Sequence, residues 1–409
     1  MVPDFSLDKN FWRRFARTYW NRRPTVIRAP FRNSIVTPAE VFRAVASATR
    51  RLREPTDDFS FRLDTGRVVL DADLDRWIPR AEDVSIERYF SRIGRSAAGR
   101  QFAIFVSDFQ IELGWVFFTR LQQFLKGLYE IEGVPANRAE MDLFFGNYRR
   151  THAGVHRDSA DVFCFVVDGR KCIRAWPADA VPSSSPVAGP ASYGRFLNRS
   201  ICLEGEPGDI IYWPSSYWHV AESGGRLGSS LSLGLYYGSG LARTIVPGLE
   251  AGSREILGGD KAKGSLPFSD QRAMLYLASS AERLGRESER LTRGLMRFWM
   301  DRITGYGFAR IPRARGRVPL RSGQAVRANP ASPILCRKFN HDLVVSANGR
   351  SIAISYHRNV VELIRTLNRG QDCLITDLLE EDQRRQQRPS RGVRRALMFL
   401  LDVRAVEYA

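Results

Sequence analysis

The spacing of three polar residues places the tightest constraint on how this chain can fold. His156 and Asp158 are two residues apart, and His219 follows 61 residues after Asp158. Residues i and i+2 of a strand point to the same face, so His156 and Asp158 can reach one point together. His219 can join them if a distant strand of the same barrel closes the site. The pattern therefore predicts β-structure in which residues far apart in the sequence face one cavity.

The chemistry of these three side chains indicates a metal site. Two imidazoles and one carboxylate form the facial triad of non-haem Fe(II) oxygenases, which leaves three coordination positions open for a co-substrate and dioxygen. A histidine two residues before an aspartate is also common by chance. The alternative is a set of ordinary core or surface side chains, so the surrounding sequence has to decide.

A turn signal and several basic residues follow Asp158. An apolar strand, a turn at Asp168-Gly169 and a second alternating strand predict a hairpin that returns Lys171 toward the metal. A buried ammonium there could hold the distal carboxylate of a dicarboxylic co-substrate. Arg170 or Arg174 could take this role instead, and a solvated hairpin lysine is the third interpretation.

The most specific stretch of the chain covers residues 204–219. Pro207-Gly208-Asp209 predicts a tight turn, residues 210–213 a short strand, and Pro214 its end before the loop that delivers His219. This stretch resembles the JmjC branch of the cupin oxygenases, in particular bacterial ribosomal-oxygenase-like protein hydroxylases. Members of that branch are Fe(II)- and 2-oxoglutarate-dependent enzymes built on a double-stranded β-helix.

The resemblance implies a role for individual residues. His156, Asp158 and His219 match the family's iron ligands, which are also its catalytic centre. Lys171 matches the basic residue that binds the C5 carboxylate of 2-oxoglutarate. The run Asp161-Val162-Phe163 is also similar to the ribosomal-oxygenase group. The implied cofactor is Fe(II), with 2-oxoglutarate and O2 as co-substrates.

Two positions depart from some relatives. Ala153 stands where they carry a threonine, and residues 230–234 lack their asparagine. In that run Ser230 and Ser232 alternate with leucines, which predicts a strand with one polar and one apolar face. We expect Ser232 beside the co-substrate; an edge strand with solvated hydroxyls is the alternative. Tyr148 is a further candidate for co-substrate binding, with a packing aromatic as its alternative.

Length, charge and cysteine content limit the rest. A chain of 409 residues with 44% hydrophobic residues should hold two or three domains with real cores. The net charge of +18 favours an anionic partner such as nucleic acid, the ribosome or an acidic peptide, although a generally basic proteome would also explain it. The five scattered cysteines predict neither a zinc site nor a disulfide framework. Without a signal peptide or transmembrane run, a cytoplasmic protein with no membrane partner is expected.

The order of patterns predicts a mixed α+β fold in three parts. Residues 1–250 should form the catalytic core, preceded by helices, one of which begins at Pro38 with Thr37 as N-cap. The resemblance implies that this core is a double-stranded β-helix of the cupin or jelly-roll type. Residues 251–312 read as helical; the resemblance implies a homodimer here, and packing against the barrel is the alternative. Residues 313–409 combine a hairpin turn at Asn348-Gly349 with helices, which suits a winged-helix-like α/β module.

The C-terminal part is locally basic, and this charge has two interpretations. It could contact phosphate groups, or it could be a solvated charged surface. The residues concerned are Arg384, Arg385, Arg388, Arg391, Arg394 and Arg395.

These features together predict a dioxygenase that hydroxylates a side chain of a protein or peptide while 2-oxoglutarate is decarboxylated to succinate and CO2. The resemblance favours a ribosomal protein or the precursor peptide of a natural product as substrate. Two other functions stay open. One is a nucleic-acid-binding or regulatory protein with a vestigial or sensory cupin metal site, and the other is a metal-dependent cupin enzyme that does not use 2-oxoglutarate.

Overall fold

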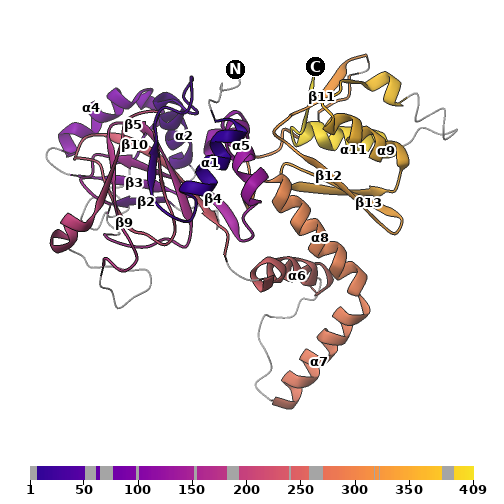
Figure 1. Cartoon of the computed structure of the whole chain (residues 1–409). Coiled ribbons are helices and arrows are strands. Elements are labelled where there is room, and N and C mark those ends of the chain that lie inside the picture. The colour runs from indigo at the N-terminus through magenta and orange to yellow at the C-terminus, as the bar shows by residue number, and fades with distance from the viewer. Residues whose placement is uncertain are drawn as a thin grey trace. The chain divides into compact units, whose positions relative to one another are not determined.

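The computed structural model describes residues 7–50, 61–64, 77–97, 101–151, 154–181, 193–238, 241–257, 270–316, 318–321, 323–379 and 391–409. Two compact units are distinguished by their internal contacts (Figure 1). Unit 1 comprises Met1–Tyr237 with Arg310–Arg313, and unit 2 comprises Gly238–Ala309 with Ala314–Ala409. The three-part division with boundaries at 250 and 312 stays a prediction.

Unit 1 is built on two antiparallel sheets. The larger has the order β1 (Thr25–Ile27), β8 (Ile210–Trp213), β5 (Asp161–Asp168), β10 (Gly228–Tyr236), β4 (Arg138–Gly146), β3 (Ala103–Val106) and β2 (Phe61–Asp64). The smaller has the order β7 (Ile201–Gly205), β6 (Lys171–Trp176) and β9 (Trp218–Glu222). Isolated bridges from Arg150 to Glu222 and from His156 to His219 add the segment after β4 to the smaller sheet. From β4 to β10 the chain thus passes back and forth between the sheets, as in a jelly roll.

The predicted hairpin at Asp168-Gly169 is wrong, although the turn itself is present. β5 pairs with β8 and β10, whereas β6 pairs with β7 and β9, so the two strands lie in different sheets. Gly169 has a positive φ of 71°, and a Cβ there would lie 2.7 Å from the carbonyl oxygen of Leu227. A turn within a hairpin and a turn between two sheets have the same sequence signal. The signal fixes the local backbone and does not determine which strands pair on either side of the turn.

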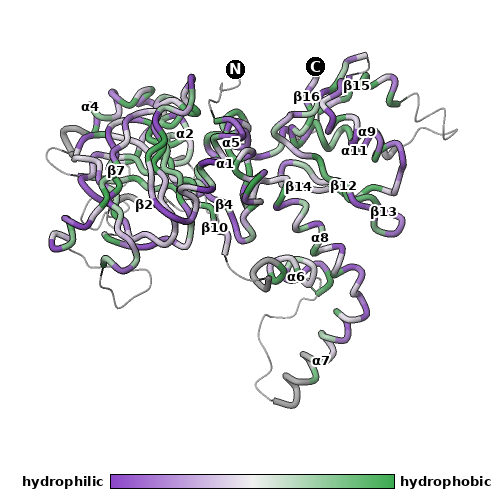
Figure 2. The backbone as a smooth tube through the Cα atoms, in the orientation of Figure 1, coloured by the Kyte–Doolittle hydropathy of each residue, from purple (hydrophilic) through white to green (hydrophobic). Residues whose placement is uncertain are grey.

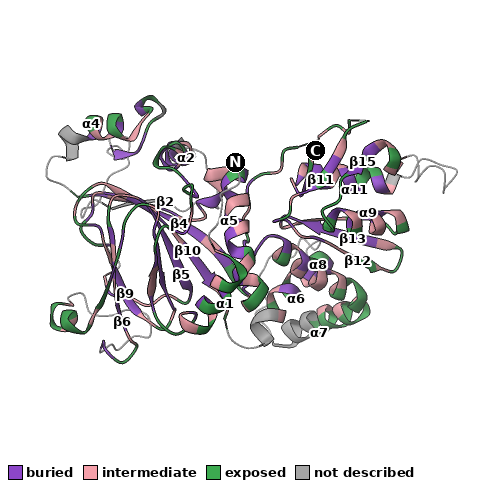
Figure 3. Cartoon of the chain, turned by 45° about the horizontal axis from the view of Figure 1, so that its top comes forward, coloured by how far each residue is buried: buried purple, intermediate pink, exposed green. Residues whose placement is uncertain are grey.

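Helices pack against the larger sheet on the face that points away from the smaller one. Trp12 of α1 (Lys9–Thr18) contacts Phe124 of α5 (Gln110–Glu132) and Phe163 of β5, with ring centroids 5.2 and 6.3 Å apart. Buried residues are concentrated on the strands beside these helices (Figure 3). Met141 and Leu143 of β4 are fully buried and belong to the same core.

Helix α2 (Pro38–Arg50) confirms the predicted start at Pro38 and the cap at Thr37. The hydroxyl of Thr37 accepts a hydrogen bond from the backbone N–H of Glu40 at 3.2 Å. The carboxylate of Glu40 accepts one from the backbone N–H of Thr37 at 2.8 Å. This reciprocal pair is a capping box, which satisfies two backbone donors at the helix start.

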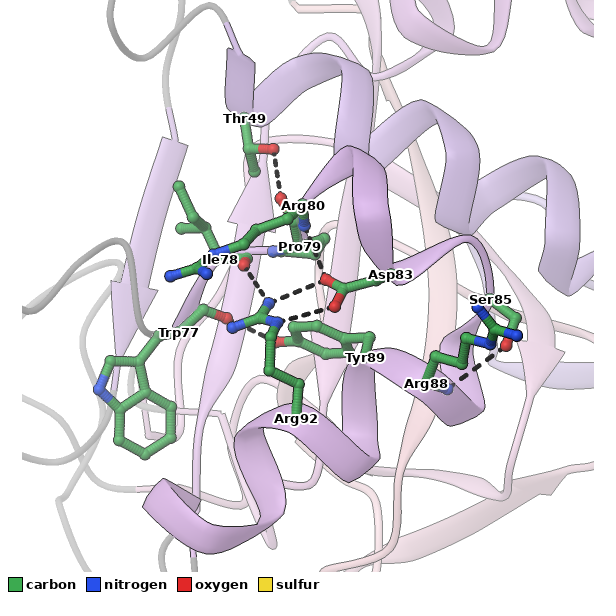
Figure 4. Close-up of polar contacts among 10 residues, drawn as sticks. All are labelled: Thr49, Trp77, Ile78, Pro79, Arg80, Asp83, Ser85, Arg88, Tyr89 and Arg92. Carbon is green, nitrogen blue, oxygen red and sulfur yellow. Dashed lines mark hydrogen bonds and ion pairs between the residues drawn. The ribbon is translucent and has the colours of Figure 1, made fainter.

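A partly buried ion pair holds helix α4 (Ile86–Ala97) against the segment before it (Figure 4). Arg92 donates to both carboxylate oxygens of Asp83, at 2.7 and 2.8 Å, and to the carbonyl of Ile78 at 2.8 Å. Burial alone would raise the pKa of Asp83, but the hydrogen bonds from Arg92 and from backbone outweigh it and leave the pKa lowered. Thr49 of α2 donates to the carbonyl of Pro79 at 2.9 Å, which links the same segment to α2.

Unit 2 begins with three helices, α6 (Leu241–Leu257), α7 (Asp270–Arg286) and α8 (Ser288–Thr304). Helices α6 and α8 approach closely, since a Cβ at Gly294 would lie 2.6 Å from the Cα of Gly252. No helix in the described part of the chain combines the length and hydropathy needed to cross a membrane.

The described remainder of unit 2 includes two small antiparallel sheets and helices. The predicted turn at Asn348-Gly349 is confirmed, because both residues have positive φ, 46° and 70°, between β13 and β14. Hydrophobic residues from the helices and both sheets form one core (Figure 2). The elements are β15 (Cys373–Leu374), β11 (Ala325–Ala328) and β16 (Val406–Tyr408); β12 (Ile334–Phe339), β13 (Asp342–Ala347) and β14 (Arg350–Ser355); and helices α9 (Arg358–Asn368) and α11 (Arg391–Asp402).

Only part of the C-terminal arginine group can be placed. Arg394 and Arg395 lie on α11 and are exposed. Arg384, Arg385 and Arg388 lie outside the described residues.

Candidate metal centre

Backbone hydrogen bonds place the two triad histidines opposite each other on neighbouring segments. His156 lies between β4 and β5, and His219 lies on β9. The backbone N–H of His156 donates to the carbonyl of His219 at 3.0 Å, and the reverse bond is 2.8 Å long. Nε2 of His156 is 3.5 Å from Oδ1 of Asp158, and Nε2 of His219 is 3.3 Å from Oδ2. The structure thus brings together the three residues whose spacing predicted a common site.

This arrangement fits a metal ion held by three ligands. Ligand atoms about 2.1 Å from an ion, at right angles to one another, are about 3 Å apart. The observed 3.3 and 3.5 Å need only a small contraction to reach that separation. Nδ1 of His156 lies 3.0 Å from the carbonyl oxygen of Gly154, which places a proton on Nδ1 and the lone pair on the Nε2 that faces Asp158.

The protonation states of the site also suit metal binding. Burial lowers the pKa of His156, and the neighbouring His219 lowers it further. Burial would raise the pKa of Asp158, but its contacts with His219 and His156 outweigh burial and leave the pKa lowered. At neutral pH His156 is therefore a neutral imidazole and Asp158 a carboxylate, the forms that bind metal ions.

A cavity of about 230 Å³ opens beside the triad, between the two sheets. The cavity extends along β4, where it is lined successively by Phe144, Asp142 and Glu140. Since residues i and i+4 of a strand are about 13 Å apart, Phe144 and Glu140 mark two distant ends. Lys171 lies at the Phe144 end, with its Nζ 5.4 Å from the ring centroid of Phe144.

Lys171 is a buried cation that has no carboxylate partner in the described part of the chain. Lys171 is the first residue of β6, and its side chain is 4% exposed and lines the cavity. Its ammonium donates a hydrogen bond to the hydroxyl of Tyr148. Among the residues that the structure describes, no acidic side chain forms an ion pair with Lys171. A buried charge is costly unless it is paired, so this end of the cavity is suited to an anionic group.

The two alternative basic residues point elsewhere. Arg170 is exposed and forms an ion pair with Glu204. Arg174 forms an ion pair with Glu222 at 2.9 Å on the outer face of the smaller sheet. Neither arginine lines the cavity that holds the triad. Of the three basic residues that the sequence offered, Lys171 is the one that faces the site.

Ser232 and Tyr148 both lie at the site. Ser232 lines the cavity, and its strand β10 lies between β5 and β4, so the edge-strand alternative is wrong. Tyr148 is 5% exposed and meets the site through its hydrogen bond with Lys171. Their roles in co-substrate binding stay predictions. Ala153 lies outside the described residues.

Two acidic residues of the cavity were missed in the sequence. Glu140 and Asp142 lie on β4, two residues apart, and both line the cavity. Burial, followed by the charges of Glu140 and Asp108, raises the pKa of Asp142 well above its usual value. Oδ1 of Asp142 has no hydrogen-bond partner within the described ranges. The signal was available, because these carboxylates alternate with apolar residues in the strand that precedes the His-x-Asp pair.

Comparison with known proteins agrees with this fold. Residues 134–240 match the JmjC domain, and this segment contains the triad, Lys171 and every strand from β4 to β10. The chain therefore contains a JmjC domain within a mixed α+β, JmjC/cupin-like fold that has N-terminal helices and C-terminal helical and small sheet regions.

The whole chain also has the fold of a solved bacterial protein. The X-ray structure of Escherichia coli ycfD matches with a TM-score of 0.52 and 17% identity over 100% of both chains. A structure described as YcfD, a ribosomal oxygenase from E. coli, matches with 0.52 and 16% over 100% of this chain and 99% of that one. Its complex with cobalt and succinic acid matches with 0.50 and 15% over 99% of each. No curated protein sequence matches the chain.

Proposed function

We propose that this protein is an Fe(II)- and 2-oxoglutarate-dependent oxygenase that hydroxylates a side chain of a protein or peptide. The observation that carries the proposal is the buried ammonium of Lys171, which has no acidic partner among the described residues, in the same cavity as the His-Asp-His group. A metal site alone would suit many cupin enzymes. A metal site together with a buried cation suits a small molecule with a carboxylate at each end, and 2-oxoglutarate is such a molecule.

The residues divide the work of binding. His156, Asp158 and His219 would hold Fe(II), which supplies the activation of dioxygen when it is bound. Lys171 would bind the C5 carboxylate of 2-oxoglutarate, while the hydroxyl of Tyr148 keeps the ammonium in position. The hydroxyl of Ser232 would donate a hydrogen bond to the co-substrate. The reaction would convert 2-oxoglutarate and O2 to succinate and CO2 as the substrate is hydroxylated.

The structural relatives support this assignment of ligands. The E. coli ribosomal oxygenase has been solved with cobalt and succinic acid, a metal ion and the expected dicarboxylate product. The name of that protein also supports a ribosomal protein as the substrate, with a natural-product precursor peptide as a second candidate.

The far end of the cavity indicates the polarity of the substrate group. Glu140 and Asp142 line the cavity at and near the end opposite Phe144, and the hydroxyl of Tyr236 donates to Glu140. The charge of this acidic wall is partly compensated, because Glu140 forms an ion pair with Arg138 at 2.8 Å and the raised pKa of Asp142 favours its protonated form. The wall therefore favours a polar group that forms hydrogen bonds with the carboxyl groups. A basic side chain on a peptide meets this requirement.

A nucleic-acid-binding or regulatory protein with a vestigial metal site explains less of the structure. That function gives no reason for the buried cation at Lys171 or for a neutral His156 beside an ionised Asp158. The winged-helix-like character of the C-terminal part, a homodimer through the helical segment and a cytoplasmic location rest on the sequence and the resemblance, and we retain them as predictions.

Hydroxylation of a peptide tests the proposed function directly. The protein, loaded with Fe(II) and supplied with 2-oxoglutarate and ascorbate, is incubated in air with ribosomal proteins and with basic peptides. We expect mass spectrometry to find a product that has gained one oxygen atom with wild-type protein and not with Asp158→Ala. Equal gain with both proteins would assign the oxidation to free iron and contradict the proposal.

A further inference from the structure

Two cysteines far apart in the sequence meet on the outer face of the smaller sheet. Cys172 lies on β6 and Cys202 on β7, and their sulfur atoms are 2.8 Å apart. Cys202 is exposed and Cys172 is half-buried, so solvent reaches the pair. The scattered cysteine positions did not predict this neighbourhood, because strand pairing creates it.

The register of the sheet explains why these two side chains converge. Cys202 lies opposite Arg174, and Cys172 lies opposite Glu204, so the two cysteines are diagonal neighbours on one face. The guanidinium of Arg174 points to Glu222 on β9, at 2.9 and 3.0 Å. It therefore does not cover Cys202, and the side chain of Cys172 can approach that cysteine. The right-handed twist of strands shortens one diagonal of a pair relative to the other.

We propose that Cys172 and Cys202 form a reversible disulfide, which makes this pair a redox modification site. A disulfide has an S–S distance of about 2.0 Å, so the sulfur atoms need to approach by about 0.8 Å. Among the described strands, β7 is at the edge of its sheet and pairs only with β6, so it can follow this movement without breaking a second ladder. The inference stands apart from the proposed oxygenase function.

A hydroperoxide is the class of oxidant that balances the reaction. The sulfur of Cys202 attacks one peroxide oxygen, the O–O bond breaks, and Cys202 becomes a sulfenic acid while the peroxide leaves as an alcohol or water. The sulfur of Cys172 then attacks the sulfenic sulfur, and the S–O bond breaks with release of water. Two thiols lose two electrons and two protons in total, and one peroxide is reduced.

The surroundings assign the order of these two steps. Burial, and then the hydrogen bond with Cys202, raises the pKa of the Cys172 thiol, so Cys172 remains protonated. Exposure favours oxidation, and Cys202 is the exposed member of the pair, so Cys202 is the first sulfur to react. The other cysteines offer no such pair: Cys164 and Cys373 are buried, and Cys336 is half-buried.

The disulfide would act on the strand that carries Lys171. Cys172 follows Lys171 directly, and their side chains point to opposite faces of β6. A bond that pulls β6 toward β7 on the outer face is therefore next to the buried ammonium on the inner face. The redox state of the cysteine pair would thus affect the position of Lys171, the first residue of the strand.

The test is a peptide map of the full-length protein after mild oxidation. The protein is treated with one equivalent of hydrogen peroxide, free thiols are alkylated, and the digest is analysed without reduction. We expect a linked species joining the Cys172 and Cys202 peptides, loss of two of the five alkylatable thiols, and recovery of both on treatment with dithiothreitol. Recovery of both peptides as separate alkylated or oxygenated species would overturn the proposal.

Matched variants locate the bond. Cys202→Ser should abolish the linked species and leave Cys172 free to be alkylated. Cys336→Ser, at a half-buried cysteine of unit 2, should leave the linked species unchanged. A link that survives Cys202→Ser would also overturn the assignment. The wild-type map is informative even if a variant folds poorly.

Discussion

The ammonium of Lys171 donates a hydrogen bond to the hydroxyl of Tyr148, and both side chains are buried. Tyr148 follows β4 of the larger sheet, and Lys171 opens β6 of the smaller one. The contact therefore joins the two sheets at the Phe144 end of the cavity. It holds the cation in position before any carboxylate arrives, which is the preorganisation that selective binding of an anion requires.

Replacement of Lys171 should weaken the co-substrate and spare the metal. Lys171→Ala removes the charge that would pair with the C5 carboxylate, so we expect the KM for 2-oxoglutarate to rise at least tenfold, about 1.4 kcal/mol. Iron affinity should stay at the wild-type level, because Lys171 is not one of the three ligands. Steady-state succinate formation and metal titration measure the two quantities.

Arg170→Ala and Arg174→Ala are matched controls, since both arginines point away from the cavity. Their KM for 2-oxoglutarate should equal that of the wild type. A tenfold rise in either control, with Lys171→Ala unaffected, would transfer the role to that arginine.

Tyr148→Phe should have a smaller effect of the same kind. The variant keeps the ring beside the ammonium, 4.8 Å from its centroid, and loses only the hydroxyl. A single hydrogen bond contributes about 0.5–1.5 kcal/mol, so the KM for 2-oxoglutarate should rise about two- to tenfold. If Tyr148 serves only in packing, the same measurement will show no change.

The acidic wall should affect the peptide and not the co-substrate. Glu140→Gln and Asp142→Asn keep the size of each side chain while removing the capacity for negative charge. We expect a higher KM for a basic peptide, by about tenfold, and little change in succinate formation without peptide. A peptide with a neutral residue at the reacting position is the control. An equal rise in the KM for both peptides would show that the two carboxyl groups do not distinguish a charged from a neutral side chain.

Asp161 should make the stability of unit 1 depend on pH. Burial raises the pKa of this carboxyl to about 6, despite hydrogen bonds from Ser215 and Tyr212. A carboxyl with a raised pKa favours folding in its protonated form. Its contribution is fully present below about pH 4, the value in an unfolded chain, and is lost as the pH rises through about 6. The loss amounts to about 3 kcal/mol.

Asp161→Asn isolates this contribution from that of other carboxylates. Urea unfolding at pH 4.5 and 6.5, followed by tryptophan fluorescence, gives the change in free energy of unfolding for each protein. The wild type should lose more stability between these pH values than the variant. An identical pH dependence in both proteins would show that Asp161 titrates normally.

The His156-x-Asp158 pair and the helix start at Pro38 could be predicted because each depends on local sequence. The two-residue spacing lets His156 and Asp158 reach one point, although His156 forms only an isolated β-bridge and Asp158 lies outside the strands. A capping box is a four-residue pattern. The partner of a strand is different, because it is chosen by the whole sheet. That is why the turn at Asp168-Gly169 was recognised but its strands were wrongly paired.

The same physical reason explains what the sequence did not reveal. The approach of Cys172 and Cys202 depends on the register between β6 and β7, which no spacing in the chain encodes. The choice among Lys171, Arg170 and Arg174 required the direction of each side chain on β6 and its turn. Once the strand phase is known, alternation alone sends Lys171 inward and Arg174 outward.

The most direct test of the account is conversion of 2-oxoglutarate to succinate by anaerobically purified protein with Fe(II), ascorbate and oxygen. Wild-type protein is compared with the double variant His156→Ala/Asp158→Ala, which should keep the fold and lose two of the three ligands. The account predicts succinate from the wild type and a background level from the variant. Equal succinate from both proteins, or none from wild type that binds iron in the presence of cell extract, would contradict it.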